Sequence, residues 1–181
     1  MTGCIALLRG INVGRAKRIT MADLRDLVAG LGHANVRTVL NSGNVLFGTT
    51  RGDTERLAAA IEAGIAARCG LASRVVVVTA ADLAVIVREN PLLDLATNRS
   101  RLLVAFVAQP AVLKRAGPLL REAWAPDALA VGSRAAYLWC ADGVLDSPLS
   151  QAFGRQFGED TTTRNWSTVL KLHAAALQGE S

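Results

Sequence analysis

The sequence predicts an α+β fold, in which a ferredoxin-like half with the order β-α-β-β-α-β is packed with a second α+β half. The first observation is that apolar strands and amphipathic helices follow one another in that order over residues 1–90. The second is the composition, because 51% hydrophobic and 19% charged residues in a chain of 181 are typical of a globular protein. We expect a first subdomain over 1–90, which includes one further helix, a linker over 91–100 and a second subdomain over 101–181.

The first strand is expected at residues 4–8, an apolar run without alternation, which indicates that both of its faces are covered. A polar loop follows, and Thr20 is the predicted N-cap of a helix, with Asp23 as its capping-box partner. Gly32 is expected to end that helix. Strands at 36–40 and 45–47 then form a hairpin around a turn of Asn, Ser, Gly and Asn.

The first half closes with a helix that begins at Asp53 or Thr54 and ends at Gly70, followed by a strand at 74–78. In a β-α-β-β-α-β sheet, the first strand lies between the third and the fourth and is antiparallel to both. The end of the first strand and the turn of the hairpin therefore meet at one edge of the sheet. We expect residues 9–12 and 41–44 to be neighbours in space.

The second half is predicted to have the order β-α-β-β-α, which is similar to the order of the first half. Either a structural duplication or a coincidence of topology accounts for this similarity. A helix opened by Thr79 precedes it, and a last amphipathic helix is expected to begin at Thr163–Trp166 with Trp166, His173 and Leu177 on its apolar face. The other expected elements are a strand at 102–108, a helix from Pro110 that is kinked or split at Gly117–Pro118, strands at 128–131 and 136–140, and a helix at 148–157.

The net charge is +5, and arginine outnumbers lysine by 17 to 3. An arginine-rich codon bias explains this excess, and so does a surface that binds anions, because the guanidinium matches phosphate and carboxylate. Cys4, Cys69 and Cys140 are too far apart to form a metal motif, and we interpret them as reduced thiols. With no signal peptide and no apolar run of membrane length, we expect a cytoplasmic protein without a membrane partner, a metal or a cofactor.

Several stretches of the chain form a specific pattern when taken together. They are Ile5–Gly14 (IALLRGINVG), Met21–Arg25 (MADLR), Asn35–Thr38 (NVRT), Ser42–Val45 (SGNV), Thr163–Trp166 (TRNW) and Thr168–Leu172 (TVLKL). This pattern resembles the domain-of-unknown-function family 1697. The resemblance spans nearly the whole chain and implies a compact α+β fold with a ferredoxin-like half, but no activity.

The candidate ligand-binding residues lie in three polar stretches. In the first, glycines allow tight turns whose amides can surround an anion beside an arginine. The second is the turn of the hairpin, and the third is the predicted start of the last helix, where free N–H groups favour an anion. Each stretch has a purely structural explanation as well. The residues are Arg9, Gly10, Asn12, Gly14, Asn41, Ser42, Asn44, Thr163, Arg164 and Asn165.

These candidates lead us to expect that the protein binds an anionic small molecule, such as a nucleotide or a phosphorylated metabolite. Binding of RNA or DNA through the sheet is an alternative, which the 4% of aromatic residues does not favour. An enzyme that acts on an anionic substrate is another, and the sequence leaves open whether any reaction is catalysed. His33, His173 and Cys4 are expected to be structural.

Overall fold

The computed structural model describes residues 1–11 and 18–179, and these residues form two compact units. The first unit comprises residues 1–83 together with 171–181, and the second comprises residues 84–170. The stretch 91–100, expected as a linker, therefore lies inside the second unit, and the last residues of the chain belong to the first.

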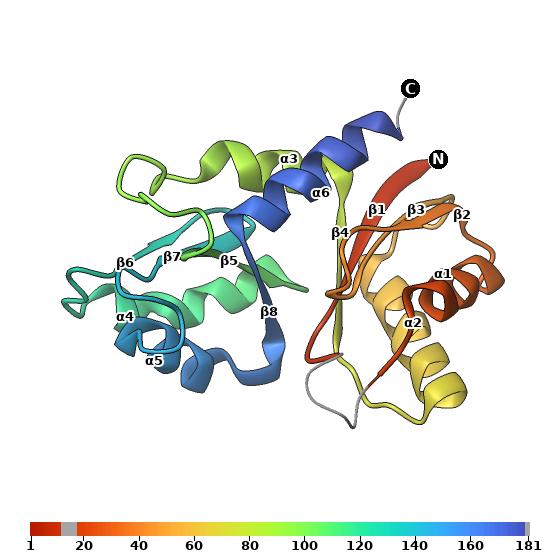
Figure 1. Ribbon diagram of the computed structural model, residues 1–181, viewed down its shortest axis with the longest axis horizontal. Coiled ribbons are helices and arrows are strands. Elements are labelled where there is room, and N and C mark those ends of the chain that lie inside the picture. Colours follow the sequence, from red (N-terminus) through yellow and green to blue (C-terminus); the bar gives the residue numbers. More distant parts are fainter. Residues whose placement is uncertain (12–17, 180–181) are drawn as a thin grey trace. The chain divides into compact units, whose positions relative to one another are not determined.

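The first unit has the predicted order β-α-β-β-α-β, and α1 and α2 cover one face of its sheet (Figure 1). Its elements are β1 (Thr2–Leu8), α1 (Met21–Gly30), β2 (Ala34–Thr38), β3 (Asn44–Thr49), α2 (Thr54–Cys69) and β4 (Val75–Thr79).

The sheet of the first unit has the strand order β2-β3-β1-β4, with every neighbouring pair antiparallel. The predicted place of β1 between β3 and β4 is confirmed. The second strand lies two residues earlier than expected, because the backbone turns at Leu40, which has a φ of +60°. A register shift between Ala34 and Arg37 also interrupts the pairing of β2 with β3.

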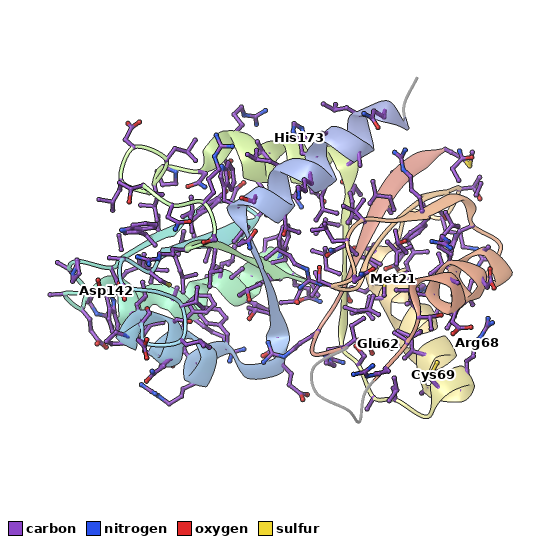
Figure 2. All side chains as sticks on the ribbon, in the orientation of Figure 1. Met21, Glu62, Arg68, Cys69, Asp142 and His173 are labelled. Carbon is purple, nitrogen blue, oxygen red and sulfur yellow. The ribbon has the colours of Figure 1, made fainter. Side chains whose placement is uncertain are left out.

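The helix ends follow the predicted capping chemistry. Thr20 Oγ1 accepts a hydrogen bond from the backbone N–H of Asp23 over 3.0 Å, and Gly32 adopts a φ of +87° after the end of α1. Asp53 caps α2 by accepting from two backbone N–H groups, and Gly70 ends α2 in the left-handed conformation. Arg68 near the end of α2 (Figure 2) lies 3.5 Å from the carboxylate of Asp23.

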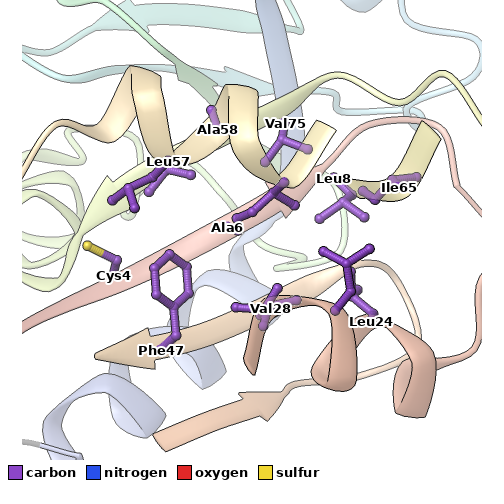
Figure 3. Packing of buried hydrophobic residues seen from close by; sticks show 14 of the residues in the cluster. Cys4, Ala6, Leu8, Leu24, Val28, Phe47, Leu57, Ala58, Ile65 and Val75 are labelled. Carbon is purple, nitrogen blue, oxygen red and sulfur yellow. The ribbon is translucent and has the colours of Figure 1, made fainter. Parts of the chain in front are cut away.

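The core of the first unit lies between the sheet and its two helices. Alternate residues of β1, Cys4, Ala6 and Leu8, face α1 and α2 together with Phe47 and other apolar side chains (Figure 3). Ile5 and Leu7, between them, are buried as well. This explains why the strand lacks alternation, and it confirms the expectation that both of its faces are covered.

The second unit repeats the strand order of the first. Its sheet has the order β6-β7-β5-β8, so its first strand again lies between the third and the fourth. The helix predicted from Pro110 is split, and Gly117 marks the change from 3₁₀ to α geometry. Its elements are β5 (Leu102–Val107), η1 (Pro110–Ala116), α4 (Gly117–Leu120), β6 (Ala128–Val131), β7 (Ala135–Trp139), α5 (Pro148–Phe157), η2 (Gly158–Asp160) and β8 (Thr161–Asn165).

Strand β8 corrects the predicted start of the last helix. Thr163, where the last helix was expected to begin, pairs with Ala105 inside β8, and α6 (Trp166–Gln178) begins three residues later. Three consecutive threonines favour an extended backbone, because their branched side chains pack well in a sheet. The second unit thus has the full order β-α-β-β-α-β, and two halves of the same topology are consistent with a duplication.

Two helices run from one unit into the other along the chain. Thr79 caps α3 (Ala80–Glu89) through the backbone N–H of Asp82, as predicted. The last part of α6 belongs to the first unit, where Arg37 of β2 donates a hydrogen bond to the carbonyl oxygen of Ala175. Leu177, expected on the apolar face of α6, is 56% exposed instead.

Candidate functional site

The end of β1 and the turn of the hairpin meet in the first unit, as the topology predicts. The backbone N–H of Leu8 donates to the carbonyl oxygen of Gly43 over 2.9 Å, so the residues after β1 lie against the turn 41–44. Residues from the start of β4 join them, because β4 is antiparallel to β1. We call this place the strand-end edge, and its described residues are Arg9, Gly10, Asn41, Ser42, Ser73 and Arg74.

Arg9 has a fixed backbone at this edge. Its N–H donates to the carbonyl oxygen of Arg74 over 2.8 Å, and its own carbonyl oxygen accepts from Ser73 Oγ over 3.0 Å. Gly10 follows with a φ of +64°, a conformation that glycine adopts without cost. Asn12 and Gly14, which the sequence also proposes for the site, lie outside the described residues.

Asn44 supports the turn from inside. It is 0% exposed, and its side-chain Nδ2 donates to the carbonyl oxygen of Val39 over 2.9 Å and to Ser42 Oγ over 2.8 Å. Gly43 has a φ of +76°, and a Cβ there would lie 2.7 Å from Ile11 Cδ1. Asn41 and Ser42 are exposed at the tip. The geometry thus gives Asn44 a positioning role and leaves the outer surface of the turn to Asn41 and Ser42.

Ser73 and Arg74 are residues that the sequence-based prediction missed. Arg74 brings a second guanidinium to the edge, 3.6 Å from the carboxylate of Glu62 on α2, and more than half of its side chain is exposed. A signal was present, because the predicted sheet order places the start of the fourth strand beside the end of the first. At this edge, the prediction used only the loop after β1 and the turn of the hairpin, and it left out the residues before β4.

The third predicted stretch belongs to the second unit. Arg164, near the end of β8, donates to Thr162 Oγ1 over 2.9 Å and to the carbonyl oxygen of Thr163 over 2.8 Å. Burial lowers the pKa of Arg164 to about 10. Asn165 Oδ1 accepts from the backbone N–H of Thr168 over 2.9 Å, so it is the N-cap of α6. This bond gives Asn165 a structural role at the start of α6.

The two buried thiols are poor nucleophiles. Burial, with a smaller contribution from the Asp82 carboxylate, raises the pKa of Cys4 to about 11. Burial and the Asp127 carboxylate also raise the pKa of Cys140, although a hydrogen bond with Ser147 opposes them. Because the thiolate is the reactive form, both side chains are inert at neutral pH.

The described residues offer no metal site and no membrane span. No three His, Cys, Asp or Glu side chains come together there in a way that could hold a metal ion. Within the same residues, no helix combines the length and the apolar character that a membrane span requires.

A groove of about 770 Å³ also opens in the first unit, beside the end of α6. Gly3 and Gly48 are directly paired across β1 and β3, so part of its floor carries no side chain. Ile5 and Leu46 give it apolar walls, and Arg37 is its charged lining residue. Its volume is typical of small-molecule sites. The sequence gives no sign of this groove, because its wall at the end of α6 comes from a distant part of the chain.

The same fold and sequence pattern occur in other proteins. Residues 1–137 match the model of a family described as "Protein of unknown function (DUF1697)". The chain is also similar in structure to the conserved bacterial protein SP0830 from Streptococcus pneumoniae, with a TM-score of 0.80. The two share 20% sequence identity, and the similarity covers 97% of this chain and 98% of SP0830. No curated protein matches the sequence.

Proposed function

The chain belongs to the DUF1697 family, whose function is unknown, and from this premise we propose that its first unit binds a small anionic molecule at the strand-end edge. The ligand class is a nucleotide or a phosphorylated metabolite. The observation that carries the proposal is the hydrogen bond from Leu8 to Gly43, which holds Arg9 and Gly10 against the exposed tip of the hairpin.

Charge supports an anionic ligand. Arg9 and Arg74 are joined through their backbones over 2.8 Å, so two guanidinium side chains start from adjacent strands. The carboxylate of Glu62 lies 3.6 Å from Arg74, and more than half of the Arg74 side chain stays exposed at the edge. Because a guanidinium offers several N–H donors in one plane, it suits phosphate oxygens better than a lysine does.

The backbone supports an anion as well. Gly10 and Gly43 both adopt positive φ values, and chains that turn in this way present successive N–H groups on one side. Ser42 and Asn41 add a hydroxyl and an amide at the tip of the hairpin. The hydrogen bonds of Asn44 fix this tip, which reduces the entropy lost when a ligand is bound.

The alternatives have weaker support. Recognition of RNA on a ferredoxin-like sheet uses aromatic side chains of the central strands for stacking. Phe47 of β3 is 3% exposed and faces the helices, where it lies against His33. An enzyme that uses a thiol nucleophile would need a lower pKa than burial gives to Cys4.

A thermal-shift screen of nucleotides and phosphorylated metabolites tests the proposal. A ligand at one hundred times its Kd adds about 2.7 kcal/mol to the free energy of unfolding. In a chain of this size, that corresponds to a rise in Tm of roughly 5–10 °C. We expect Arg9→Ala and Arg74→Ala to lose most of the shift produced by the best ligand.

Arg155→Ala is the matched control, because Arg155 is an exposed arginine on α5 of the second unit. It should keep the full shift. Arg164→Ala measures the contribution of the third predicted stretch, of which Thr163 and Arg164 remain candidate ligand-binding residues. The proposal is wrong if no anion raises the Tm of the wild-type protein, or if Arg155→Ala and Arg9→Ala lose the shift equally.

A further inference from the structure

His33 is a buried histidine of the first unit, and it is not one of the residues of the strand-end edge. It follows Gly32 at the end of α1, and its ring lies 4.7 Å from the ring of Phe47 with a tilt of 36°. The side chain is 8% exposed. Neither ring nitrogen forms a hydrogen bond with any of the described residues, although an imidazole carries one donor and one acceptor or two donors.

This histidine lines a cavity of about 410 Å³. The cavity also contacts the loop before α2 and the first turns of that helix, and its charged lining residues are Arg51, Asp53 and Arg56. The backbone of Arg51 is held in place, because its N–H donates to Thr49 Oγ1 over 3.1 Å. The ring nitrogens are not among the fully buried polar atoms that lack a partner, so they stay accessible from the cavity. A small molecule bound there would offer the imidazole a hydrogen-bond partner.

The charged residues that line the cavity carry a net charge of one positive unit, because two arginines face one aspartate. Asp53 accepts from the backbone N–H groups of Glu55 and Arg56, and its other oxygen lies 3.1 Å from Arg56 Nε. This carboxylate is therefore already matched by the start of α2 and by Arg56. Arg51 is left as the positive charge in excess, and the positive end of α2 adds to its field.

The remaining wall is apolar. It consists of Leu31, Leu57 and Ala60, of which Leu57 is 3% exposed. A ligand that fits these surroundings carries one negative charge and a short hydrocarbon part. A phosphate dianion would bring two charges against a single excess positive charge and would leave the apolar wall uncovered.

We propose that this cavity, the His33 cavity, binds a small organic monocarboxylate, with its carboxylate between Arg51 and the imidazole of His33 and its hydrocarbon part against Leu57. The site and its ligand class are separate from those of the strand-end edge, so either proposal can fail without the other. Burial, helped by Arg51, lowers the pKa of His33, so a neutral imidazole is present at neutral pH to donate one N–H to the carboxylate.

The chain offers a clean measurement, because it contains two histidines, His33 and His173. Their imidazole signals are followed in ¹H–¹³C correlation spectra and assigned with His173→Gln. The protein is titrated with sodium butyrate, sodium acetate and inorganic phosphate at constant ionic strength. We expect the His33 signal to move saturably with butyrate while the His173 signal stays in place. Acetate, which is two methylene groups shorter, should bind about tenfold more weakly.

Arg51→Gln removes the excess charge and should weaken butyrate binding at least about tenfold, the loss expected for one charge-assisted hydrogen bond. Arg68→Gln is the matched control, since Arg68 lies at the other end of α2, and it should bind like the wild-type protein. Three outcomes would overturn the proposal: a His33 signal that does not move with butyrate, tighter binding of phosphate than of butyrate, or unchanged binding in Arg51→Gln.

Discussion

The side chain of Glu62 on α2 accepts a hydrogen bond over 2.8 Å from the backbone N–H of Val75, the first residue of β4. A side chain of a helix thus accepts the hydrogen bond of a backbone N–H on the outer strand of the first sheet. The neighbouring contact of Glu62 with Arg74, at 3.6 Å, is exposed and adds little. The bond ties α2 to the end of the sheet where the strand-end edge lies.

Glu62→Ala should therefore lower the free energy of unfolding by about 1–2 kcal/mol, because it leaves a partly buried N–H without its partner. Glu62→Gln keeps an acceptor oxygen and should cost less than half as much. Urea unfolding of the three proteins measures both values. Equal losses for the two variants would show that the ion pair with Arg74, and not the bond to Val75, is what matters.

Gly43 should tolerate no side chain. In Gly43→Ala, the φ of +76° and the 2.7 Å approach of a Cβ to Ile11 Cδ1 act together, and we expect a loss of about 2–4 kcal/mol. Gly70→Ala is the matched comparison, because Gly70 has a φ of +63° with no atom within 4 Å of its Cβ position. It should lose only about 1 kcal/mol. Chemical denaturation gives the difference, and similar losses would mean that the close approach is relieved by movement of Ile11.

Asn165 should behave as a helix cap. Asn165→Ala removes the acceptor for the backbone N–H of Thr168 and should lower the free energy of unfolding by about 1 kcal/mol. Asn165→Ser, which keeps a capping oxygen, should restore most of it. The thermal-shift screen provides the second readout. If Asn165→Ala kept full stability and lost the shift caused by an anion, Asn165 would be a ligand-binding residue instead.

Stability should fall in alkaline solution through Cys4. The pKa of this thiol is raised in the folded protein to about 11 from 9.0, so the unfolded chain loses the proton first. The stability due to the neutral thiol is complete below pH 9 and is lost as pH rises from 9 to 11, up to about 2 kcal/mol. In Cys4→Ala, the free energy of unfolding should depend less steeply on pH over this range. A slope equal to that of the wild-type protein would contradict the assignment.

The first unit could be predicted from the sequence because its local signals agree. The apolar run of β1, the cap Thr20 and the stop at Gly70 each allow one interpretation, and the strand order then follows from chirality and connection rules. Strand β8 could not be predicted in this way. Threonine is favoured both in strands and at helix N-caps, so Thr161, Thr162 and Thr163 support two structures, and pairing with β5 decides between them.

The candidate site was predictable to a similar extent. Sheet order alone brings Arg9 to the turn 41–44, and the same rule would have added Arg74. Burial of Asn44 was not predictable, because an asparagine in a turn can point either into the hairpin or into solvent. The His33 cavity could not be predicted from the sequence either, because its walls come from the end of α1, the start of α2 and the loop before α2.

The contact between Arg37 and Ala175 has a consequence for biosynthesis. Residues 171–181 belong to the first unit, although all of residues 84–170 are translated before them. A chain emerging from the ribosome folds in order from its N-terminus, so most of the first unit is available to fold long before its closing helical segment is made. The groove beside Arg37 therefore needs the chain through residue 179, and nascent chains halted before residue 171 would have a first unit without that wall.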